Sequence, residues 1–452
     1  MSIWKGLANY GAARRKLAAV ALGVGGASWP GQAASPRLAA PPDFASYYRA
    51  PVAHLAPVLR REGDSLRVFL NHAAPASGSA ALQLRLAAWS GYDAAQPLWE
   101  ETRALRPYPG SDSSAPVQVL TAAVAAARLA PGQVLQVSLG PVGAAPAAVA
   151  SSAPAAASAA PSPAAAPAAE APATTAWLPL SAERLARPFI LLDSTGLILD
   201  RPYVRASEGV AVATFGLSEP VRWRRYPTGA AALPPFTDPR TQPAAPRTLA
   251  VLDSSAAPVA AGTLLRFAQP GLLALKVGGL GGEPVRTVPL LVTRADFPGH
   301  TTASELIENL LYLTSATERR ELATAPDPKR AVDRFWLRAA GGDQERARRL
   351  IRSYYGRITA ANELFSGHKP GWRTDRGLLY VVLGPPQRVS RPTGEEHWHY
   401  DHAGHLGEAV TFTFRARPTT LAPANYELVR RPEYQQLWYA AVDQWRNPLS
   451  VR

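Results

Sequence analysis

The chain has 452 residues, 47% of them hydrophobic, which suffices for several separately cored domains and excludes a chain that is disordered throughout. Its 48 basic and 34 acidic residues give a formal net charge of +14, but nearly all the bases are arginines spread from end to end, so the sequence lacks the clustered basic footprint of a nucleic-acid-binding protein. The absence of cysteine excludes disulfides, thiolate nucleophiles, cysteine-ligated metals and a lipidated N-terminal cysteine.

The N-terminus has the pattern of an export signal. Basic residues precede an apolar run from Leu17 to about Ala27, and small residues then favour cleavage after Ala33. We therefore predict a signal peptide over residues 1–33 and a mature protein that is periplasmic, on the cell surface or secreted; the alternative is a short amphipathic segment of a cytosolic protein. No later stretch approaches about 20 uninterrupted apolar residues, so no transmembrane span is expected after signal removal.

Residues 34–185 are predicted to form an immunoglobulin-like β-sandwich. Apolar and polar residues alternate, between Pro and Gly punctuation, over 66–70, 82–86, 117–120 and 134–139. Residues 141–176 are almost wholly Ala, Pro, Ser and Thr, which predicts a tether or disordered insertion. We interpret Trp177–Leu180 as a last strand of the same domain, beyond that insertion.

Residues 186–294 are predicted to form a second sandwich. Its strands are expected over 189–192, 210–215, 221–224, 272–277 and 285–292. The glycine-rich run 278–282 lies between two of these strands and opens no helix, which favours a hairpin loop over a phosphate-binding loop.

From Thr302 the hydrophobic period changes from 2 to 3.6. A helix is expected behind a cap at Thr302 or Ser304, and further helices over 316–324, 328–339 and 343–365. The last helix carries several arginines, interpreted as a solvated face: Arg346, Arg348, Arg349, Arg352 and Arg357.

The C-terminal block begins with Gly371, Trp372, Thr374, Asp375, Arg376 and Gly377. The apolar run 378–383 is predicted to be a strand that ends at the turn Gly384, Pro385, Pro386. Strands over 395–400, with Trp398 and Tyr400, and over 409–414 would complete an antiparallel meander.

This block resembles the GWxTD domain, found in bacterial exported proteins of uncharacterised function. The resemblance runs from about Ala295 to Glu427 and includes the Phe335–Trp336 and Tyr354–Tyr355 pairs and a stretch from Arg357 through Asn362 to Phe365. It implies a helical segment followed by a small α+β domain over residues 295–452. The family-motif positions are Asn362, Gly371, Trp372, Thr374, Asp375, Arg376, Gly377, Gly384, Pro385, Pro386, Trp398 and Tyr400. The sequence departs from the family in its His-rich stretch 397–405, where aromatic residues are more usual, and in lacking a lipidation cysteine.

The motif itself has a structural interpretation. Gly371 and Gly377 permit close backbone approach or positive φ, Trp372 supplies a large buried anchor, and Thr374 and Asp375 can bond nearby backbone amides. We interpret this combination as a staple between the preceding helix and the following strand, in preference to a ligand or catalytic site at Thr374, Asp375 and Arg376.

Other residues suggest chemistry less strongly. His397 and His399 share one face of the expected strand, and a turn could bring His402 or His405 beside them as transition-metal ligands, although solvated imidazoles are the simpler interpretation. No hydrolase motif occurs, and Glu395 and Glu396 should face opposite sides of a strand.

The aromatic-rich stretch from Tyr434 to Trp445 has two interpretations. It is either an amphipathic helix packed on its own domain or an interaction site centred on Trp438 and Trp445.

These observations predict a multidomain protein with two mainly-β, immunoglobulin-like sandwich domains, a helical segment and a small α+β GWxTD domain. The expected function is that of a non-enzymatic, exported interaction or scaffold protein of the cell envelope. Its expected partners are unidentified envelope proteins, with no nucleic acid and no cofactor. The alternatives are a small-ligand or transition-metal module at His397–His405 and, third, a periplasmic hydrolase.

Overall fold

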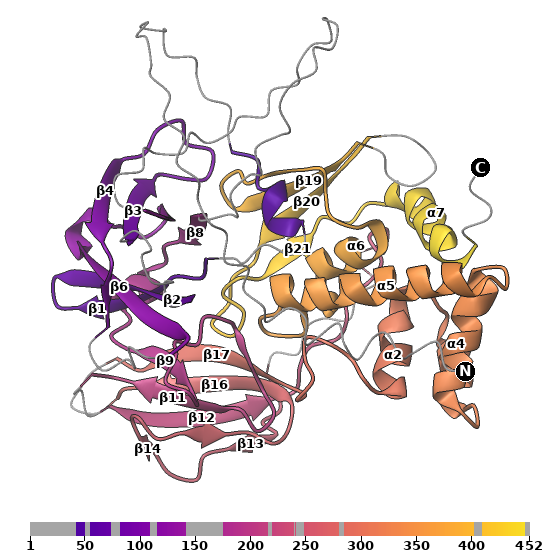
Figure 1. The fold of residues 1–452 in the computed structure, drawn as a ribbon, viewed down its shortest axis with the longest axis horizontal. Coiled ribbons are helices and arrows are strands. Elements are labelled where there is room, and N and C mark those ends of the chain that lie inside the picture. Colours follow the sequence, from indigo (N-terminus) through magenta and orange to yellow (C-terminus); the bar gives the residue numbers. More distant parts are fainter. Residues whose placement is uncertain are drawn as a thin grey trace, which may run out of the picture.

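The computed structural model describes residues 42–49, 55–73, 82–108, 115–141, 175–215, 219–238, 240, 248–279, 284–401 and 409–447. The predicted signal peptide, most of the Ala/Pro-rich tract, His402 and His405 lie outside these residues. Two β-rich units stack on each other at one side of the molecule, and a helical unit with its own sheet lies beside both (Figure 1). None of the helices within the described ranges has the length and apolar character needed to cross a bilayer.

The first β-rich unit consists of two four-stranded sheets. One has the order β1 (Val58–Glu62), β2 (Ser65–Ala73), β6 (Val117–Ala125), β5 (Arg106–Pro107), and the other β4 (Trp99–Ala104), β3 (Leu82–Trp89), β7 (Val134–Pro141), β8 (Thr175–Pro179). Leu66, Leu84 and Leu135 belong to one core that both sheets share. The predicted strands are confirmed, including the last one: β8 pairs antiparallel with β7 although residues 142–174 separate them in sequence.

The second β-rich unit also has two sheets around a shared core. The larger has the order β10 (Tyr203–Arg205), β17 (Arg286–Thr293), β16 (Gly271–Val277), β12 (Pro220–Tyr226), β13 (Asp253–Ser254), with β14 (Val259–Ala260) also on β12; the smaller has β15 (Leu265–Arg266), β11 (Gly209–Ala213), β9 (Ile190–Asp193). The glycine run joins antiparallel β16 and β17, as predicted for a hairpin, and Gly278 and Gly279 adopt positive φ angles of 100° and 97°.

The helical part confirms the predicted change of period. It contains α2 (Ala303–Asn309), α3 (Ala316–Thr324), α4 (Pro328–Ala339) and α5 (Gln344–Phe365). Thr302 with Glu305, and Ser315 with Glu318, form capping boxes, while Asp327 and Asp343 cap α4 and α5. Each start therefore has a side-chain acceptor for otherwise unpaired backbone N–H groups.

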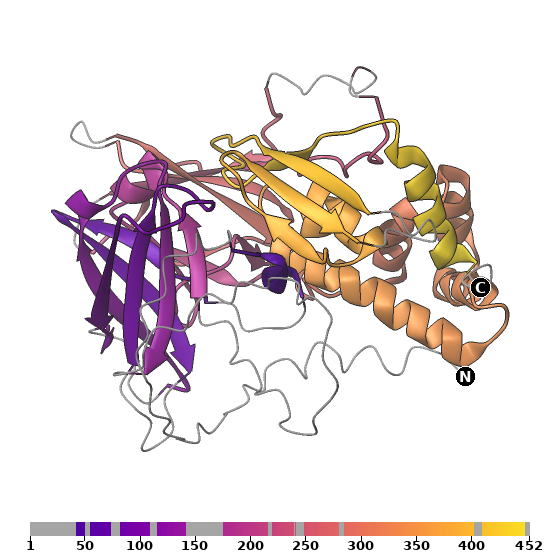
Figure 2. The ribbon, with the colours of Figure 1, turned by 90° about the horizontal axis from the view of Figure 1, so that it is seen from above.

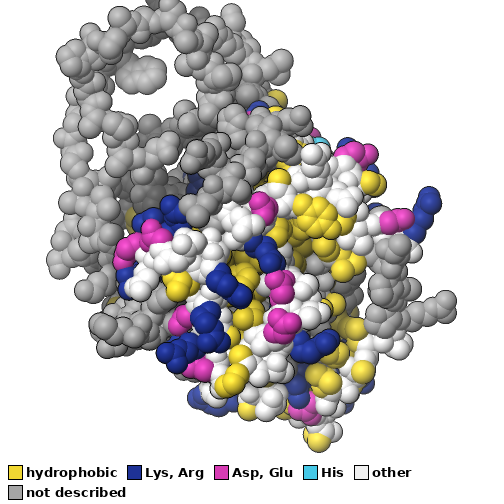
Figure 3. Space-filling view, turned by 90° about the vertical axis from the view of Figure 1, so that its right-hand side faces the viewer, with side chains coloured by type: hydrophobic (Ala, Val, Ile, Leu, Met, Phe, Trp, Pro, Cys, Tyr) yellow, Lys and Arg dark blue, Asp and Glu magenta, His cyan; other side chains and the backbone are white. Residues whose placement is uncertain are grey.

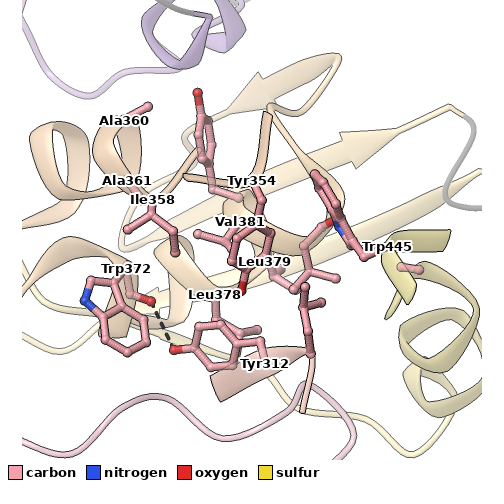
Figure 4. Packing of buried hydrophobic residues seen from close by; sticks show 14 of the residues in the cluster. Tyr312, Tyr354, Ile358, Ala360, Ala361, Trp372, Leu378, Leu379, Val381 and Trp445 are labelled. Carbon is pink, nitrogen blue, oxygen red and sulfur yellow. Dashed lines mark hydrogen bonds between the residues drawn. The ribbon is translucent and has the colours of Figure 1, made fainter. Parts of the chain in front are cut away.

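The prediction of a strand over 378–383 is wrong, because Asp375–Leu383 forms helix α6. The Thr374 side chain caps α6 by accepting the Gly377 N–H at 3.0 Å. Leu378, Leu379 and Val381 are buried (Figure 4), and so is Val382. A short run buried on every side shows no period, so its sequence cannot distinguish a helix from a buried strand.

The chain ends in a meander, β18 (Arg388–Ser390), β19 (Glu395–Tyr400), β20 (Val410–Ala416), β21 (Tyr426–Leu428), followed by α7 (Tyr434–Arg446). This sheet lies over α5 and α6 (Figures 1 and 2). Trp398, Tyr400, Phe412 and Phe414 project inward and belong to the core shared with the helices.

Candidate functional site

The motif begins where three backbone segments approach one another. A Cβ on Gly371 would lie 1.9 Å from the Ala361 carbonyl oxygen of α5, and a Cβ on Gly377 would lie 1.9 Å from the Gly371 oxygen. Only glycine fits at either position, because real Cβ atoms do not approach other atoms so closely. The predicted staple therefore joins α5 to helix α6, instead of joining a helix to a strand.

Trp372 anchors this junction. Trp372 is 5% exposed, its backbone N–H donates to Asn362 Oδ1 at 3.3 Å, and its backbone carbonyl accepts the Tyr312 hydroxyl at 3.0 Å, drawn as a dashed line in Figure 4. The Asn362 amide in turn donates to the Pro298 carbonyl at 3.1 Å. One buried amide thus ties α5 both to the motif and to the loop that follows β17.

The Asp375 carboxylate binds backbone and guanidinium donors. It accepts the Leu428 N–H at 2.7 Å and both terminal nitrogens of Arg430, the shorter bond being 2.7 Å. Arg430 also donates to the Leu233 carbonyl at 3.2 Å, in the loop that follows β12 of the second β-rich unit. The acid of the motif therefore connects α6, β21 and that loop.

Other contacts fix the same loop on the motif. The Ala232 N–H donates to the Arg373 carbonyl at 2.8 Å, and the Lys369 ammonium donates to the Ala230 carbonyl at 3.0 Å. Ala232 is itself part of the core of the C-terminal part.

Arg376 points toward a buried carboxylate on β19. Its guanidinium lies 3.7 Å from the Glu396 carboxylate, and Glu396 is 1% exposed. The same carboxylate accepts three hydrogen bonds of 2.8 Å each, from Arg391 Nε, Tyr48 Oη and Trp398 Nε1. Burial alone would raise the pKa of Glu396, but the Arg391 and Arg376 guanidinium groups outweigh it and lower that pKa. Glu396 is therefore held ionised, which suits a structural ion pair and not a general acid.

Arg391 also lies among aromatic rings from distant parts of the chain. Its guanidinium carbon is 4.4 Å from the Phe44 ring centroid and 5.3 Å from that of Tyr92. Phe44 lies in residues 42–49, which we call the N-terminal segment, and Tyr92 lies in the first β-rich unit. The sequence analysis missed this cluster because Tyr48 and Glu396 are 348 residues apart; the only local signal is the aromatic density of Phe44, Tyr47 and Tyr48.

Hydrogen bonds from β19 and from α5 fix the turn after α6 and the end of α6. Gly384 has a φ of 95°, and Tyr400 on β19 donates its hydroxyl to the Gly384 carbonyl at 2.8 Å. Pro385 is exposed and Pro386 is buried. Arg357 donates to the Val381 and Val382 carbonyls at 3.2 and 3.1 Å, which satisfies acceptors at the end of α6. The prediction that Arg357 lies on a solvated face is therefore wrong.

The outward histidines each have a partner. His397 Nε2 lies 2.8 Å from Glu395, and His399 Nδ1 lies 2.9 Å from the Thr411 hydroxyl. Within the part of the chain that the structure describes, no three His, Asp or Glu side chains gather as a metal site requires. Glu395 and Glu396 face opposite sides of β19, as predicted.

The C-terminal aromatic stretch packs on its own domain. Trp438 and Trp445 are 4% and 7% exposed, and Trp445 Nε1 donates to the Val382 carbonyl at 3.0 Å. The alternative of an interaction site centred on these two tryptophans is wrong.

A hollow of about 360 Å³ opens between α3 and α4. Buried Leu322, Ala331 and Phe335 and exposed Glu321, Arg334 and Arg338 contribute to its lining. On the end of the molecule where α4 and α7 lie, basic, acidic and hydrophobic side chains are interspersed (Figure 3).

Comparison with known proteins bears on the C-terminal part. Residues 281–447 match the family model of the GWxTD domain. A search of curated proteins gives no match. The motif, its upstream aromatic pairs and this match lead to one conclusion: the C-terminal part of the chain, residues 281–447, is a GWxTD domain.

Proposed function

We propose that this protein is a non-enzymatic, exported interaction scaffold of the cell envelope. The observation that carries the proposal is how the motif's polar groups are used. Thr374 caps α6, Asp375 binds Arg430 and the Leu428 N–H, and Arg376 lies beside Glu396. Each of these polar groups bonds another part of the same chain. The motif therefore serves to hold the domain together, which supports a scaffold role over a catalytic one.

Export is supported by the sequence of residues 1–33, with its basic start, apolar run and small residues before the expected cleavage point after Ala33. Mass spectrometry of the protein recovered from fractionated cells tests this. A mature chain in the periplasmic or surface fraction supports export, whereas an uncleaved chain in the cytosol contradicts it.

In this proposal the two β-rich units are immunoglobulin-like sandwiches that act as spacers. Each has two sheets around one core and several antiparallel hairpins. Asn71 of the first unit exchanges two hydrogen bonds with the backbone of Ile198 in the second, at 2.7 and 3.2 Å. Such ties favour a fixed orientation, which a spacer requires.

The hollow between α3 and α4 is the proposed contact surface for an envelope protein. Its apolar lining suits an inserted hydrophobic side chain, and its exposed Glu321, Arg334 and Arg338 suit a polar rim. The occupant in this proposal is an apolar side chain of an envelope protein with charged neighbours.

Site-specific photo-crosslinking in cells tests this surface. A photoreactive residue at Arg338 should give a discrete crosslinked product, and one at exposed Arg222, on β12 of the second β-rich unit, should not. Equal crosslinking at both positions, or none at either, would count against the scaffold.

The rival is a transition-metal module at His397–His405. It is favoured by one observation, that His397 and His399 lie on the same outward face of β19. Elemental analysis of untagged protein decides between them: stoichiometric Zn, Ni or Cu that disappears in a variant with His397 and His399 replaced by Ala would support the module.

A further inference from the structure

The N-terminal segment, residues 42–49, is built into the C-terminal part of the protein. Phe44, Ala45 and Tyr48 are 1%, 1% and 4% exposed and belong to the core of the helices and the meander sheet. The matched GWxTD range, 281–447, does not contain them. A distant eight-residue segment therefore occupies a place in the core of this domain.

The segment binds the free edge of the meander sheet. β18 is the edge strand, and its Val389 carbonyl accepts the Phe44 N–H at 2.9 Å. The Val389 N–H donates to Asp43 Oδ1 at 2.8 Å, so a side-chain carboxylate takes the place of a backbone carbonyl. These two bonds precede a 3-10 helix, Ala45–Tyr48, so the segment caps the edge of β18 without adding a strand to the sheet.

Two aromatic side chains provide the apolar contacts of the segment. The Phe44 ring packs against Tyr92 and Trp177 at centroid distances of 5.4 and 5.6 Å, with the Arg391 guanidinium 4.4 Å from its centroid. The Tyr48 ring lies 5.1 Å from Trp398, and its hydroxyl reaches Glu396. The groove is defined by Tyr92, Trp177, Val389, Arg391, Glu396 and Trp398.

Two of the hydrogen bonds to Glu396 do not involve the segment. Arg391 Nε and Trp398 Nε1 both bond Glu396 at 2.8 Å, and both belong to the C-terminal part. These bonds preorganise the carboxylate that receives Tyr48, which lowers the cost of binding.

We propose that this groove is a peptide-binding site whose resident ligand is the chain's own N-terminal segment. The site recognises a short peptide with the pattern Asp-Phe-x-x-x-Tyr: the acid and the Phe N–H pair with β18, the Phe fills the aromatic pocket, and the Tyr hydroxyl bonds Glu396. The proposal goes beyond the scaffold function and does not depend on the partner at the α3–α4 hollow.

Cleavage of the full mature chain tests it. A specific protease site replaces residues 50–54, the protein is cut, and gel filtration with intact-mass analysis shows whether the cut segment stays bound. We expect it to stay bound and to exchange with a fluorescent synthetic peptide of residues 42–49, followed by anisotropy, while the near-UV circular dichroism of the body is unchanged.

Peptide variants provide the matched controls. Phe44→Ala should weaken binding by about 100-fold or more, because it empties a buried aromatic pocket. Tyr48→Phe should weaken it by about 10-fold, because it removes a hydroxyl bonded to a buried charge. Ser46→Ala, at an exposed position, should change it by less than about 2-fold.

Three results would overturn the proposal. Unfolding of the body when the cut segment leaves would make the segment an integral part of the core. Failure of the labelled peptide to bind an intact body would mean that only the covalent link holds the segment. Equal weakening by Phe44→Ala and Ser46→Ala would remove the assigned specificity.

Discussion

The two faces of strand β19 carry polar residues that look alike in sequence and differ in use. Glu396 on the inner face is buried and bonded to Tyr48, Arg391 and Trp398, whereas Glu395 on the outer face is half-exposed and meets His397 and Arg415. The inner face holds distant segments together, and the outer face remains in contact with solvent. Charged residues of this domain therefore have to be judged by the face they occupy.

Replacement of the inner carboxylate should have the largest effect. Glu396→Gln leaves the Arg391 guanidinium without its counter-charge in a buried site, so we expect a loss of about 3–5 kcal/mol in the free energy of unfolding. Glu395→Gln, one residue away on the outer face, should cost less than about 1 kcal/mol. Urea denaturation of both variants measures this, and similar losses would erase the difference between the two faces.

The second largest loss of stability is expected from a substitution that adds a side-chain atom inside the motif. Gly377→Ala places a Cβ 1.9 Å from the Gly371 oxygen, a backbone atom that cannot turn aside, and should destabilise the protein by about 1–3 kcal/mol or more. Gly356→Ala is the control, since that helical glycine has nothing within 4 Å of its added Cβ. It should be neutral or stabilise by up to about 1 kcal/mol. Equal losses of stability in both variants would show that close approach at Gly377 is not the cause.

The sequence predicted the elements whose hydrophobic residues repeat with a clear local period. The longer strands of both β-rich units and the capped helices from Thr302 onward follow from periods of 2 and 3.6, whereas strands such as β1 and β4 were not predicted. The need for glycine at 371 and 377 follows from the motif. Helix α6 was missed because an apolar run buried all round has no period. The prediction that Arg357 lies on a solvated face was wrong because a helical wheel does not show that the C-terminal carbonyl groups of α6 lie beside this residue.

The Glu396 cluster could not be predicted for a different reason. Its members come from the N-terminal segment, the first β-rich unit and the C-terminal sheet, and no local pattern relates residues so far apart. The adjacent charges Glu395 and Glu396, in a strand that otherwise alternates polar and apolar residues, indicated only that these two side chains face opposite sides of the strand.

The partly buried His300 extends the comparison to the pH dependence of stability. Burial lowers the pKa of His300 to about 4, so the folded chain resists protonation that the unfolded chain accepts near the ordinary value of about 6.5. Stability should therefore be full above about pH 6.5 and fall as the pH drops toward 4, by about 1–2 kcal/mol. His300→Phe should flatten this slope, and unfolding at pH 8 isolates its packing cost. Parallel pH profiles for variant and parent would show that other groups cause the slope.

The smallest effect is expected at an ion pair on the outer surface. Arg446 of α7 bonds Glu318 of α3 at 2.7 Å and lowers the pKa of Glu318 to about 2, so the pair should stabilise above about pH 4.5 and fade as the pH falls through 2. Both side chains are about a third exposed, at 37% and 35%, so screening by water limits the contribution to about 0.5–1 kcal/mol. Glu318→Gln removes the charge but keeps a side chain suited to the capping box of α3 and leaves the bond from Arg446 to the Leu313 carbonyl. The difference from the parent should be measurable at low ionic strength and vanish in about 1 M salt. If the stability difference persists in high salt, the Arg446–Glu318 pair is no more screened than the buried ion pairs of Glu396. Exposure to solvent would then not explain the contrast between inner and outer charges.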